Sequence, residues 1–382
     1  MSPDRPGAAA AREGSAATLA GRLARPYRLE TWRLREAWPW PLLVGLGLFL
    51  VYAACAPRTV ALEDDGLFLL ASYFNGIAHP PGYPVFTLVG HLFSQVPVGT
   101  VAWRVHLVSA FFGGLGCAVL WCIARDLVPS RAVATAAALA FGFSGVYWSQ
   151  AIIAEVYTLN VFVTLLVAWM VLRLAGEHPG QGGVGVRPVG WRDAVLLGLV
   201  YGLGLSNHWP LLVLFSPAYL LLAWPVLGPL LRRTPALLLG LAVGLLPYLW
   251  LYLRSQMDPE ISFFGPIEGL SEFLQFVSRS TYSGADHEAG AGLADKLGYL
   301  RYQGWAVLDQ FTPLGALLAA LGLLLPGRHR RVTLALLAGA LCVSLLLVLL
   351  LDRDFTRLGV FVYRVYPIPA YAVLALFLAL GL

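Results

Sequence analysis

The run AWRVHLVSAFFGGLGCAVLWCIA, from Ala102 to Ala124, decides the fold class of this chain. A helix that rises 1.5 Å per residue needs about 20 mostly apolar residues to cross roughly 30 Å of hydrocarbon. Similar runs recur throughout the 382 residues, which are 58% hydrophobic and 12% charged, with a mean hydropathy of +0.72. No soluble domain of this size could bury so much apolar surface. We therefore predict an all-α polytopic membrane protein.

About ten apolar runs are long enough to serve as transmembrane helices. The predicted spans are 38–56, 102–124, 132–148, 156–174, 194–205, 210–227, 235–253, 305–325, 332–351 and 366–382. Two long loops remain on one face, at about 57–101 and 255–303, and the first of them is large. The tail 1–37 is rich in Ala, Gly, Pro and Arg, which predicts a disordered or surface-lying segment. Because the last run stops at Leu382 without a polar flank, the sequence leaves open that the chain continues further.

The arginines predict which face is cytoplasmic, since Arg and Lys are in excess there near the ends of spans. With the N-terminus inside, one face carries the tail and the turns with Arg125, Arg131, Arg173, Arg192, Arg232, Arg233, Arg328, Arg330 and Arg331. The other, extracytoplasmic face of the cell (inner or plasma) membrane keeps most of the acids. The net charge of +5 then reflects topology and contact with anionic membrane lipids, and no aromatic-rich basic surface indicates a nucleic-acid partner.

The densest polar cluster, VALEDDGLFLLASYFNGIAHPPGYP, lies in the first outer loop. Its carboxylates Glu63, Asp64 and Asp65 cannot all ionise cheaply without a nearby cation, so we expect one of them to accept a proton. The proline-rich turn that follows would aim His79 and Tyr83 at the surface that the loop faces. The alternative is that the acids only cap a helix and the turn only reverses the chain.

Other polar residues are also predicted on the outer side. Glu155 and Tyr157 lie near the outer end of a span, where Arg104 is the candidate ion-pair partner of Glu155, with His106 beside it. This pair is equally consistent with a structural role. Asn207 and His208 lie in a turn between two short spans, and a histidine in such a turn is more often hydrogen-bonded or solvated than a ligand.

Arginines of the second outer loop are candidates for binding a phosphate, because the planar guanidinium pairs with two phosphate oxygens at once. These are Arg254 and Arg279, with Tyr282 nearby, and Arg364 precedes the last span. Each could instead anchor its segment at the membrane surface. An outer site with acids, arginines and aromatic residues suits a lipid-phosphate sugar donor. One carboxylate would take the proton of the attacking hydroxyl, and an arginine would stabilise the departing phosphate.

Several motifs carry a resemblance to a known family. They are EDDG (63–66), GIAHPPGYP (76–84), AWRVHLVSA (102–110), WSQAIIAEVYTLN (148–160), GLSNHWPLLVL (204–214), FFGPIEGLSEFLQFVSRSTYSG (263–284) and VYRVYPIPAY (362–371). Together they resemble a family of bacterial multispanning proteins related to protein O-mannosyltransferases. The resemblance implies a GT-C glycosyltransferase fold over 38–382, a polyprenyl-phosphate-linked sugar as donor, and inverting transfer to a protein or glycan hydroxyl.

The resemblance also implies that an acid of the first outer loop is catalytic, and it aligns Asp64 with the family's aspartate. Leu67 replaces a commonly acidic residue and Asp65 a commonly small one, so the choice between Asp64 and Asp65 stays open. We predict Asp64 as the base, with Asp65 or Glu63 second, and mannose or another hexose as the sugar.

Two other classes of protein remain compatible with the sequence. A transporter or flippase of lipid-linked sugars would use the same polar groups, although its key charges would be expected near the bilayer midplane. A scaffold for envelope assembly is the third. The three acids could also bind a divalent metal, but no histidine completes a recognisable ligand pattern, so a metal is left open.

Overall fold

The computed structural model describes residues 25–30, 38–176, 188–282, 291–350 and 353–382. The helices are α3 (Pro39–Cys55), α4 (Asp65–Tyr73), α5 (Pro84–Ser94), α6 (Val101–Leu127), α7 (Arg131–Gly142), α8 (Gly145–Ala151), α9 (Tyr157–Leu174), α10 (Trp191–Leu214), α11 (Ser216–Ala223), α12 (Leu227–Leu231), α13 (Thr234–Gly244), α14 (Leu246–Ser255), α15 (Leu270–Ser278), α17 (Leu293–Leu324), α18 (Arg330–Leu341), α19 (Leu347–Leu350), α20 (Arg357–Tyr363) and α21 (Ile368–Gly381). Within these ranges the fold is all-α, and pairing outside helices is limited to isolated bridges such as that between Ile77 and Ser262.

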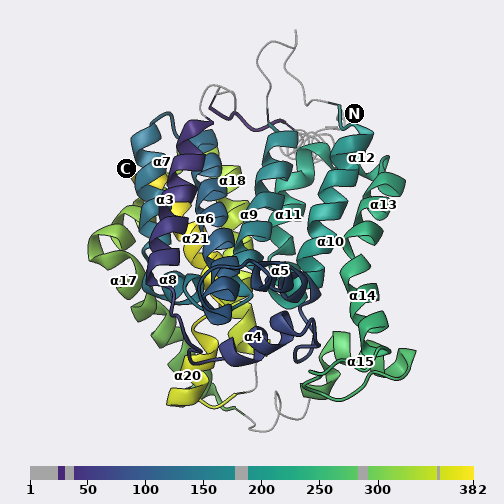
Figure 1. The fold of residues 1–382 in the computed structure, drawn as a ribbon. Coiled ribbons are helices and arrows are strands. Elements are labelled where there is room, and N and C mark those ends of the chain that lie inside the picture. The colour runs from purple at the N-terminus through teal and green to yellow at the C-terminus, as the bar shows by residue number, and fades with distance from the viewer. Residues whose placement is uncertain (1–24, 31–37, 177–187, 283–290, 351–352) are drawn as a thin grey trace, which may run out of the picture.

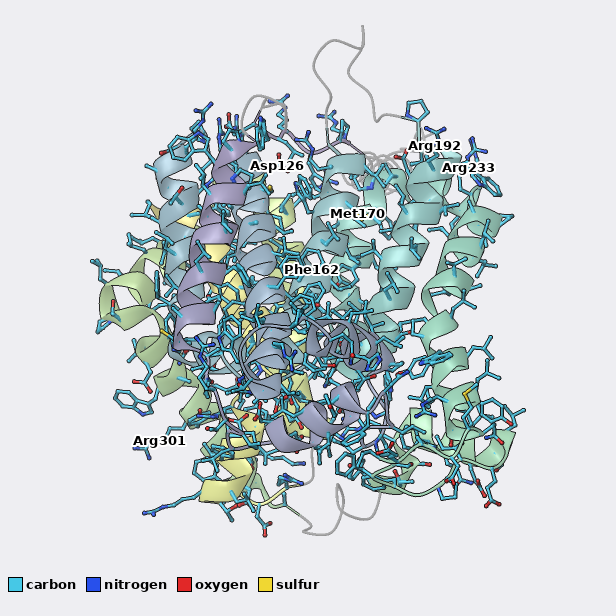
Figure 2. All side chains as sticks on the ribbon, viewed as in Figure 1. Asp126, Phe162, Met170, Arg192, Arg233 and Arg301 are labelled. Carbon is cyan, nitrogen blue, oxygen red and sulfur yellow. The ribbon has the colours of Figure 1, made fainter. Side chains whose placement is uncertain are left out.

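The long helices run side by side, and several short helices lie at one end of the bundle (Figure 1). Helices α4, α15 and α20 lie at this end, which we call the loop face. The opposite end carries Asp126, Arg192 and Arg233, whereas Arg301 projects near the loop face (Figure 2). We call this opposite end the arginine-rich face. The segregation matches the arrangement predicted from the arginines.

A short strip of the N-terminal tail lies against helix ends on the arginine-rich face. The Tyr27 N–H donates to the Ala175 carbonyl at 2.9 Å, and the Glu30 N–H donates to that of Asp126 at 2.8 Å. Arg331 stacks over the Tyr27 ring at 4.8 Å. Residues 25–30 thus pack along this face, and the disordered or surface-lying character of the tail as a whole stays a prediction. The rest of the predicted tail, 1–24 and 31–37, lies outside the described residues.

The chain is a multi-pass integral membrane protein. Within the described ranges, six helices are long and apolar enough to cross a membrane, and up to eight when each bent helix pair is counted as one span. Shorter apolar helices, among them α3 and the segment Ser216–Leu231, account for other predicted spans. The total of about ten crossings stays a prediction.

The predicted turn between two short spans is present inside α10. His208 has non-helical backbone angles, φ −144° and ψ 81°. The hydroxyls of Tyr201 and Ser216 are 2.9 Å apart, although fifteen residues of straight helix would separate them by about 22 Å. The chain therefore doubles back at His208, and this places the polar residues of the turn deep in the protein.

The second outer loop is shorter than predicted. Helix α17 begins at Leu293, inside the range 255–303 that the sequence assigns to the loop. Its first turns carry Asp295 and Arg301, which lower the local hydropathy. Apolar runs alone therefore do not predict this part of the helix. The loop also contains α15, and its residues 283–290 lie outside the described part of the chain.

Glycine allows two of the long helices to touch along their backbones. A Cβ atom on Gly198 of α10 would lie 2.1 Å from the Leu237 carbonyl oxygen of α13, and one on Gly240 would lie 2.0 Å from that of Val195. Because lipid is as apolar as the helix surfaces, the hydrophobic effect does not drive two helices together in a membrane. Close van der Waals packing of the kind seen here stabilises the pair instead. It fixes α13 against the half of α10 that leads to the turn at His208.

The arrangement of the two faces generates a prediction about topology. In a variant without the four native cysteines, we expect Arg301→Cys to react with a membrane-impermeant thiol reagent added outside cells. Arg192→Cys, on the arginine-rich face, should react only after the membrane is opened, because Arg-rich turns stay in the cytoplasm. The opposite labelling pattern would contradict the predicted orientation.

Candidate active site

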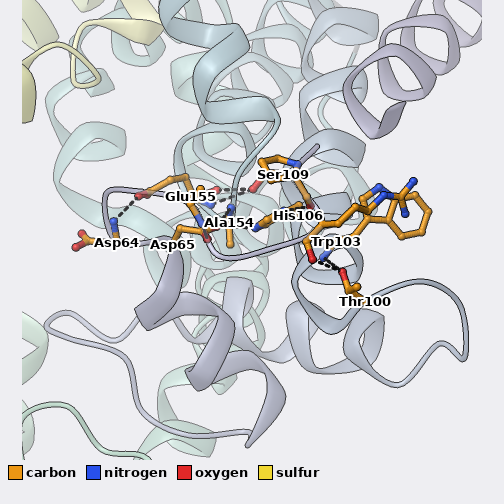
Figure 3. A network of polar contacts seen from close by, with 11 residues as sticks. Asp64, Asp65, Thr100, Trp103, His106, Ser109, Ala154 and Glu155 are labelled. Carbon is orange, nitrogen blue, oxygen red and sulfur yellow. Dashed lines mark hydrogen bonds and ion pairs between the residues drawn. The ribbon is translucent and has the colours of Figure 1, made fainter. Parts of the chain in front are cut away.

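A fully buried carboxylate, Asp65, organises the loop that contains the three consecutive acids. Its Oδ2 accepts the Ala61 N–H at 2.7 Å, and its Oδ1 accepts the Ala154 N–H at 2.7 Å. The Nε2 atom of His106, on α6, lies 2.8 Å from Oδ1, and both side chains are 0% exposed. Figure 3 shows how Asp65 points inward between α6 and the α8–α9 linker. Asp65 is therefore committed to holding these segments together and does not face the solvent.

The two preceding acids point elsewhere. Glu63 has a left-handed backbone, with φ 68°, so successive carboxylates diverge. Its side chain is paired with Arg364 and accepts the Gln150 Nε2–H at 3.0 Å. The side chain of Asp64, in contrast, is 58% exposed and its Oδ2 lies 3.2 Å from Nε2 of His79. Of the three acids, Asp64 alone is open to a reacting hydroxyl.

A fourth acid, Glu155, lies behind Asp64 in the linker between α8 and α9. Its Oε1 accepts the Asp64 N–H at 3.3 Å, and its own backbone is held by Ser109 of α6 at 3.0 and 3.1 Å (Figure 3). Burial, reinforced by the negative charges of Asp64 and Glu63, raises the pKa of Glu155 well above its ordinary value. Glu155 thus supports the Asp64 backbone from a buried position that disfavours its charged form.

The predicted pairing of Arg104 with Glu155 is wrong. The Arg104 guanidinium bonds the Val96 carbonyl, on the other side of α6 from the acids. His106 is two residues further on and therefore projects about 200° away around the helix, which directs it at Asp65. The residue that the sequence placed beside Arg104 is the one that reaches the acid cluster.

Asp64 opens into a cavity of about 620 Å³ on the loop-face side of the bundle. Its lining residues are Asp64, His79, Tyr83, Tyr157, His208, Trp209, Pro210, Leu211, Leu214, Ser278, Arg279, Ser280, Tyr282, Tyr299, Leu347, Arg353, Gly359, Val362, Tyr363 and Tyr366. Acid, cationic, aromatic and aliphatic side chains therefore share one space. This composition suits a ligand with a charged group and a hydrocarbon part.

Five of the predicted site residues form the aromatic wall of this cavity. The Tyr83 ring lies 5.8 Å from the His208 ring and 5.1 Å from the His79 ring, and the His208 ring lies 5.6 Å from that of Tyr157. The Tyr282 ring lies 6.2 Å from that of His79. The turn at His208 and the turn after Pro80 thus meet in the cavity that Asp64 lines, whereas the sequence predicted only that both lie on the outer side.

Asn207 does not line the cavity. It is fully buried, and its Nδ2–H donates to the Val156 carbonyl at 3.1 Å. The neighbouring Asn160 donates to the His208 carbonyl at 3.1 Å. The Asn160 amide thus binds a backbone carbonyl of the turn itself, whereas the Asn207 amide ties the turn to the start of α9. Asn207 thus supports the turn from behind.

The two predicted phosphate-binding arginines have different surroundings. Arg254 is directed at the C-terminal end of α4, where its Nε–H donates to the Asn75 carbonyl at 2.8 Å. A cation there complements the carbonyls that the end of a helix leaves unpaired. Arg254 is absent from the cavity lining, so the structure does not bring it together with Asp64. Arg279, which has a left-handed backbone with φ 63°, does line the cavity.

The three consecutive acids are not arranged as a metal site. Glu63, Asp64 and Asp65 have separate partners, and among the described residues no group of three or more His, Cys, Asp or Glu side chains is positioned to hold a metal ion.

Sequence reasoning missed Gln150, which binds Glu63, and Arg353 and Tyr363, which line the cavity. It named Arg364 and His106, but not their partners Glu63 and Asp65. The ionisable residues among them carried a usable signal, since each stands next to or inside an apolar run. Which acid each one meets depends on contacts between distant segments, and a single sequence does not contain that information.

Comparison with known proteins shows what this chain is similar to. Residues 64–225 match the family model described as the Protein O-mannosyl-transferase TMEM260 N-terminal domain. The chain carries a TMEM260-type domain.

Protein O-mannosyl-transferase TMEM260 of Mus musculus is 32% identical to the chain over 281 residues, covering 68% of the chain and 38% of that protein. The tmem260 protein of Dictyostelium discoideum is 25% identical over 306 residues, covering 74% and 36%. The resemblance to protein O-mannosyltransferases is thus confirmed, and the chain spans less than two fifths of either relative.

The fold that contains the TMEM260-type domain is also known. The crystal structure of ArnT from Cupriavidus metallidurans bound to undecaprenyl phosphate matches with a TM-score of 0.59 at 18% identity, covering 92% of this chain and 60% of that one. The apo form of the same protein matches with a TM-score of 0.55. The prediction of a GT-C fold is therefore confirmed, because the chain has the ArnT-like GT-C arrangement.

The role of Asp65 predicts a stability defect. Asp65→Ala leaves two buried N–H groups and His106 without their partner, which should cost roughly 3 kcal/mol or more and lower the thermal midpoint in detergent. Asp64→Ala should leave that midpoint nearly unchanged, because the Asp64 side chain is largely exposed. Equal destabilisation by both variants would contradict the division of roles.

The surroundings of Glu155 predict a dependence of stability on pH. Because its pKa is raised in the folded state, Glu155 contributes stability that is fully present below the ordinary glutamic acid pKa of about 4.3 and is lost as pH rises toward the folded value. Glu155→Gln keeps an acceptor for the Asp64 N–H but does not titrate. The thermal midpoint of the wild type should therefore fall relative to that of Glu155→Gln as the pH is raised above the ordinary glutamic acid pKa of about 4.3. Parallel curves would show that Glu155 does not carry this proton.

Proposed function

We propose that this chain forms the membrane part of an inverting glycosyltransferase, which moves a hexose from a polyprenyl phosphate to a protein or glycan hydroxyl. The observation that carries the proposal is the single cavity in which the exposed acid Asp64, Arg279 and apolar residues meet. Mannose and a protein acceptor are the first choices, because both relatives are named protein O-mannosyl-transferases. ArnT, which shares the fold, was solved with undecaprenyl phosphate, and this supports a lipid-linked donor.

The cavity lining provides a separate place for each part of such a donor. Leu211 and Leu214, just after the turn at His208, and Leu347 of α19 offer aliphatic contacts for the lipid chain. Arg279 offers a cation for the phosphate, since guanidinium remains charged in partly buried sites. The aromatic wall formed by Tyr83, Tyr157, His208 and Tyr282 gives the sugar flat surfaces to pack against.

In the proposed reaction the acceptor hydroxyl attacks the anomeric carbon while the bond between that carbon and the phosphate oxygen breaks. The proton of the hydroxyl passes to the Asp64 carboxylate, and the bonding electrons leave with the polyprenyl phosphate. His79, 3.2 Å from Asp64, fixes the orientation of this carboxylate. Arg279 stabilises the charge that develops on the departing phosphate.

We further propose that the site is extracytoplasmic, in the plasma or inner membrane. The arginine-rich face would then lie in the cytoplasm with the N-terminus, and the cavity would open on the other side of the bilayer. No nucleotide sugar is readily supplied there, which favours a donor that arrives through the membrane. A transporter would share some of these polar contacts, but it would not need an acid positioned to accept a hydroxyl proton.

The proposal predicts that Asp64→Asn lowers the rate of transfer by about 10²- to 10⁴-fold, the usual contribution of a general base, with little change in thermal stability. The measurement is hexose transfer from polyprenyl-phosphate hexose by the purified protein in nanodiscs, together with intact masses of envelope proteins from cells. Asp258→Asn is a matched control, because Asp258 is an exposed acid of the second outer loop that does not line the cavity. Unimpaired transfer by folded Asp64→Asn would refute the proposed mechanism.

A further inference from the structure

A second arginine, Arg353, reaches the cavity from a segment that the proposed mechanism does not use. Arg279 follows α15, whereas Arg353 precedes α20, and both side chains line the same space as Asp64. The same cavity is lined by Leu347 and Val362, which flank Arg353 in the sequence, and by the tyrosines of α17 and α20. This stretch of the chain therefore contributes both a cation and aliphatic side chains to the cavity.

The segment that carries Arg353 is fastened to the outer half of α17. The Phe355 N–H donates to Oδ1 of Asp295 at 2.9 Å, and the Tyr299 hydroxyl donates to the Asp354 carbonyl at 2.9 Å. The Phe355 ring packs edge-on against the Tyr299 ring, with 5.2 Å between the centroids. We call the contacts made by Asp295, Gly298, Tyr299, Asp354 and Phe355 the α17 clasp.

Gly298 is the point of closest approach in the α17 clasp. A Cβ atom added there would lie 2.6 Å from Cγ and 2.7 Å from Cδ1 of Phe355, so the Phe355 ring would have to leave its place against α17. Gly304, further along the same helix, has no atom within 4 Å of its added Cβ. Helix α17 thus contains one glycine that contacts the clasp, Gly298, and one that does not, Gly304.

The clasp fixes the backbone next to a long and otherwise adaptable side chain. An arginine whose backbone is already ordered loses less entropy when it binds an anion, and its planar donors can pair with two oxygens of a phosphate. Leu347 and Val362, which line the same cavity, would suit the first carbons of a lipid attached to that phosphate. A protein or glycan acceptor would not need these aliphatic side chains.

We propose that Arg353 binds the phosphate of the lipid donor and that the α17 clasp positions it. This inference rests on the proposed function, and it adds a second cation and the device that holds it. Arg353 contacts the phosphate on the α20 side of the cavity, while Arg279 approaches from the α15 side. The donor phosphate is thus held between two segments that are far apart in the sequence.

The first test measures binding without transfer. Undecaprenyl phosphate, which carries no sugar, is titrated into the full chain in nanodiscs and followed by native mass spectrometry. Arg353→Gln should weaken binding roughly 10- to 100-fold, the range expected for a lost hydrogen bond to a charged group, and Arg353→Lys should restore part of it. Arg301→Gln removes an exposed charge from α17 outside the cavity lining and should bind as the wild type does.

The second test isolates the clasp with a double-mutant cycle. Gly298→Ala should weaken binding of undecaprenyl phosphate, whereas Gly304→Ala should not, and both changes favour the helix. In the Arg353→Gln background Gly298→Ala should have no further effect, because the residue that the clasp positions is gone. An equal effect of Gly298→Ala in both backgrounds would overturn the positioning role.

These outcomes separate the inference from the proposed function. Unchanged lipid binding by Arg353→Gln, or a change confined to the KM of the acceptor, overturns the role of Arg353 even if Asp64→Asn abolishes transfer. If no hexose is transferred but undecaprenyl phosphate binding depends on Arg353, the proposed function fails and the phosphate site stands.

Discussion

The site depends on one buried interaction, the set of contacts made by the Asp65 carboxylate. Within a low-dielectric interior, a buried carboxylate that accepts two backbone N–H groups and faces His106 cannot turn away without leaving unsatisfied polar groups. It ties the first outer loop to α6 and to the α8–α9 linker. Because Asp65 is fixed inward and Glu63 adopts a left-handed backbone, Asp64 is left facing the cavity. The direction of the proposed base is therefore set by its neighbours in the sequence.

Four acids near one another acquire different roles through their surroundings. Asp65 is structural, Glu63 is neutralised by Arg364, and Glu155 is buried behind the loop with a raised pKa. Asp64 has a half-open environment with a histidine at 3.2 Å. A group that must take a proton from a bound hydroxyl needs access first, and only this acid of the four lines the cavity. The four side chains are all carboxylic acids, so their chemistry alone does not assign them these different roles.

The sequence predicted the features that depend on local pattern. The apolar runs predicted the long helices, and the arginines predicted two different faces. The SNHWP segment predicted a turn, which the structure has at His208. Features that depend on the rotation of a helix or on a distant partner were not predictable. Arg104 and His106 are two residues apart, yet only His106 faces the acids. Arg254 looked like a phosphate ligand but meets the carbonyls at the end of α4, a partner almost 180 residues away in the chain.

The region that matches the TMEM260 family model does not build the cavity alone. Residues 64–225 supply Asp64, His79 and the turn at His208, whereas Arg279, Arg353 and Tyr363 come from the chain beyond it. The acid side of the cavity, with Asp64, and its cationic side, with Arg279 and Arg353, thus come from different parts of the sequence. The ion pair between Arg364 and Glu63 connects these two parts of the chain. A change in how α21 packs against α6, α7 and α9 would move the segment that carries Arg353 and Arg364 relative to the acid without altering any of these residues. The TMEM260-type domain therefore acquires its proposed chemistry only through its contacts with the helices that follow it.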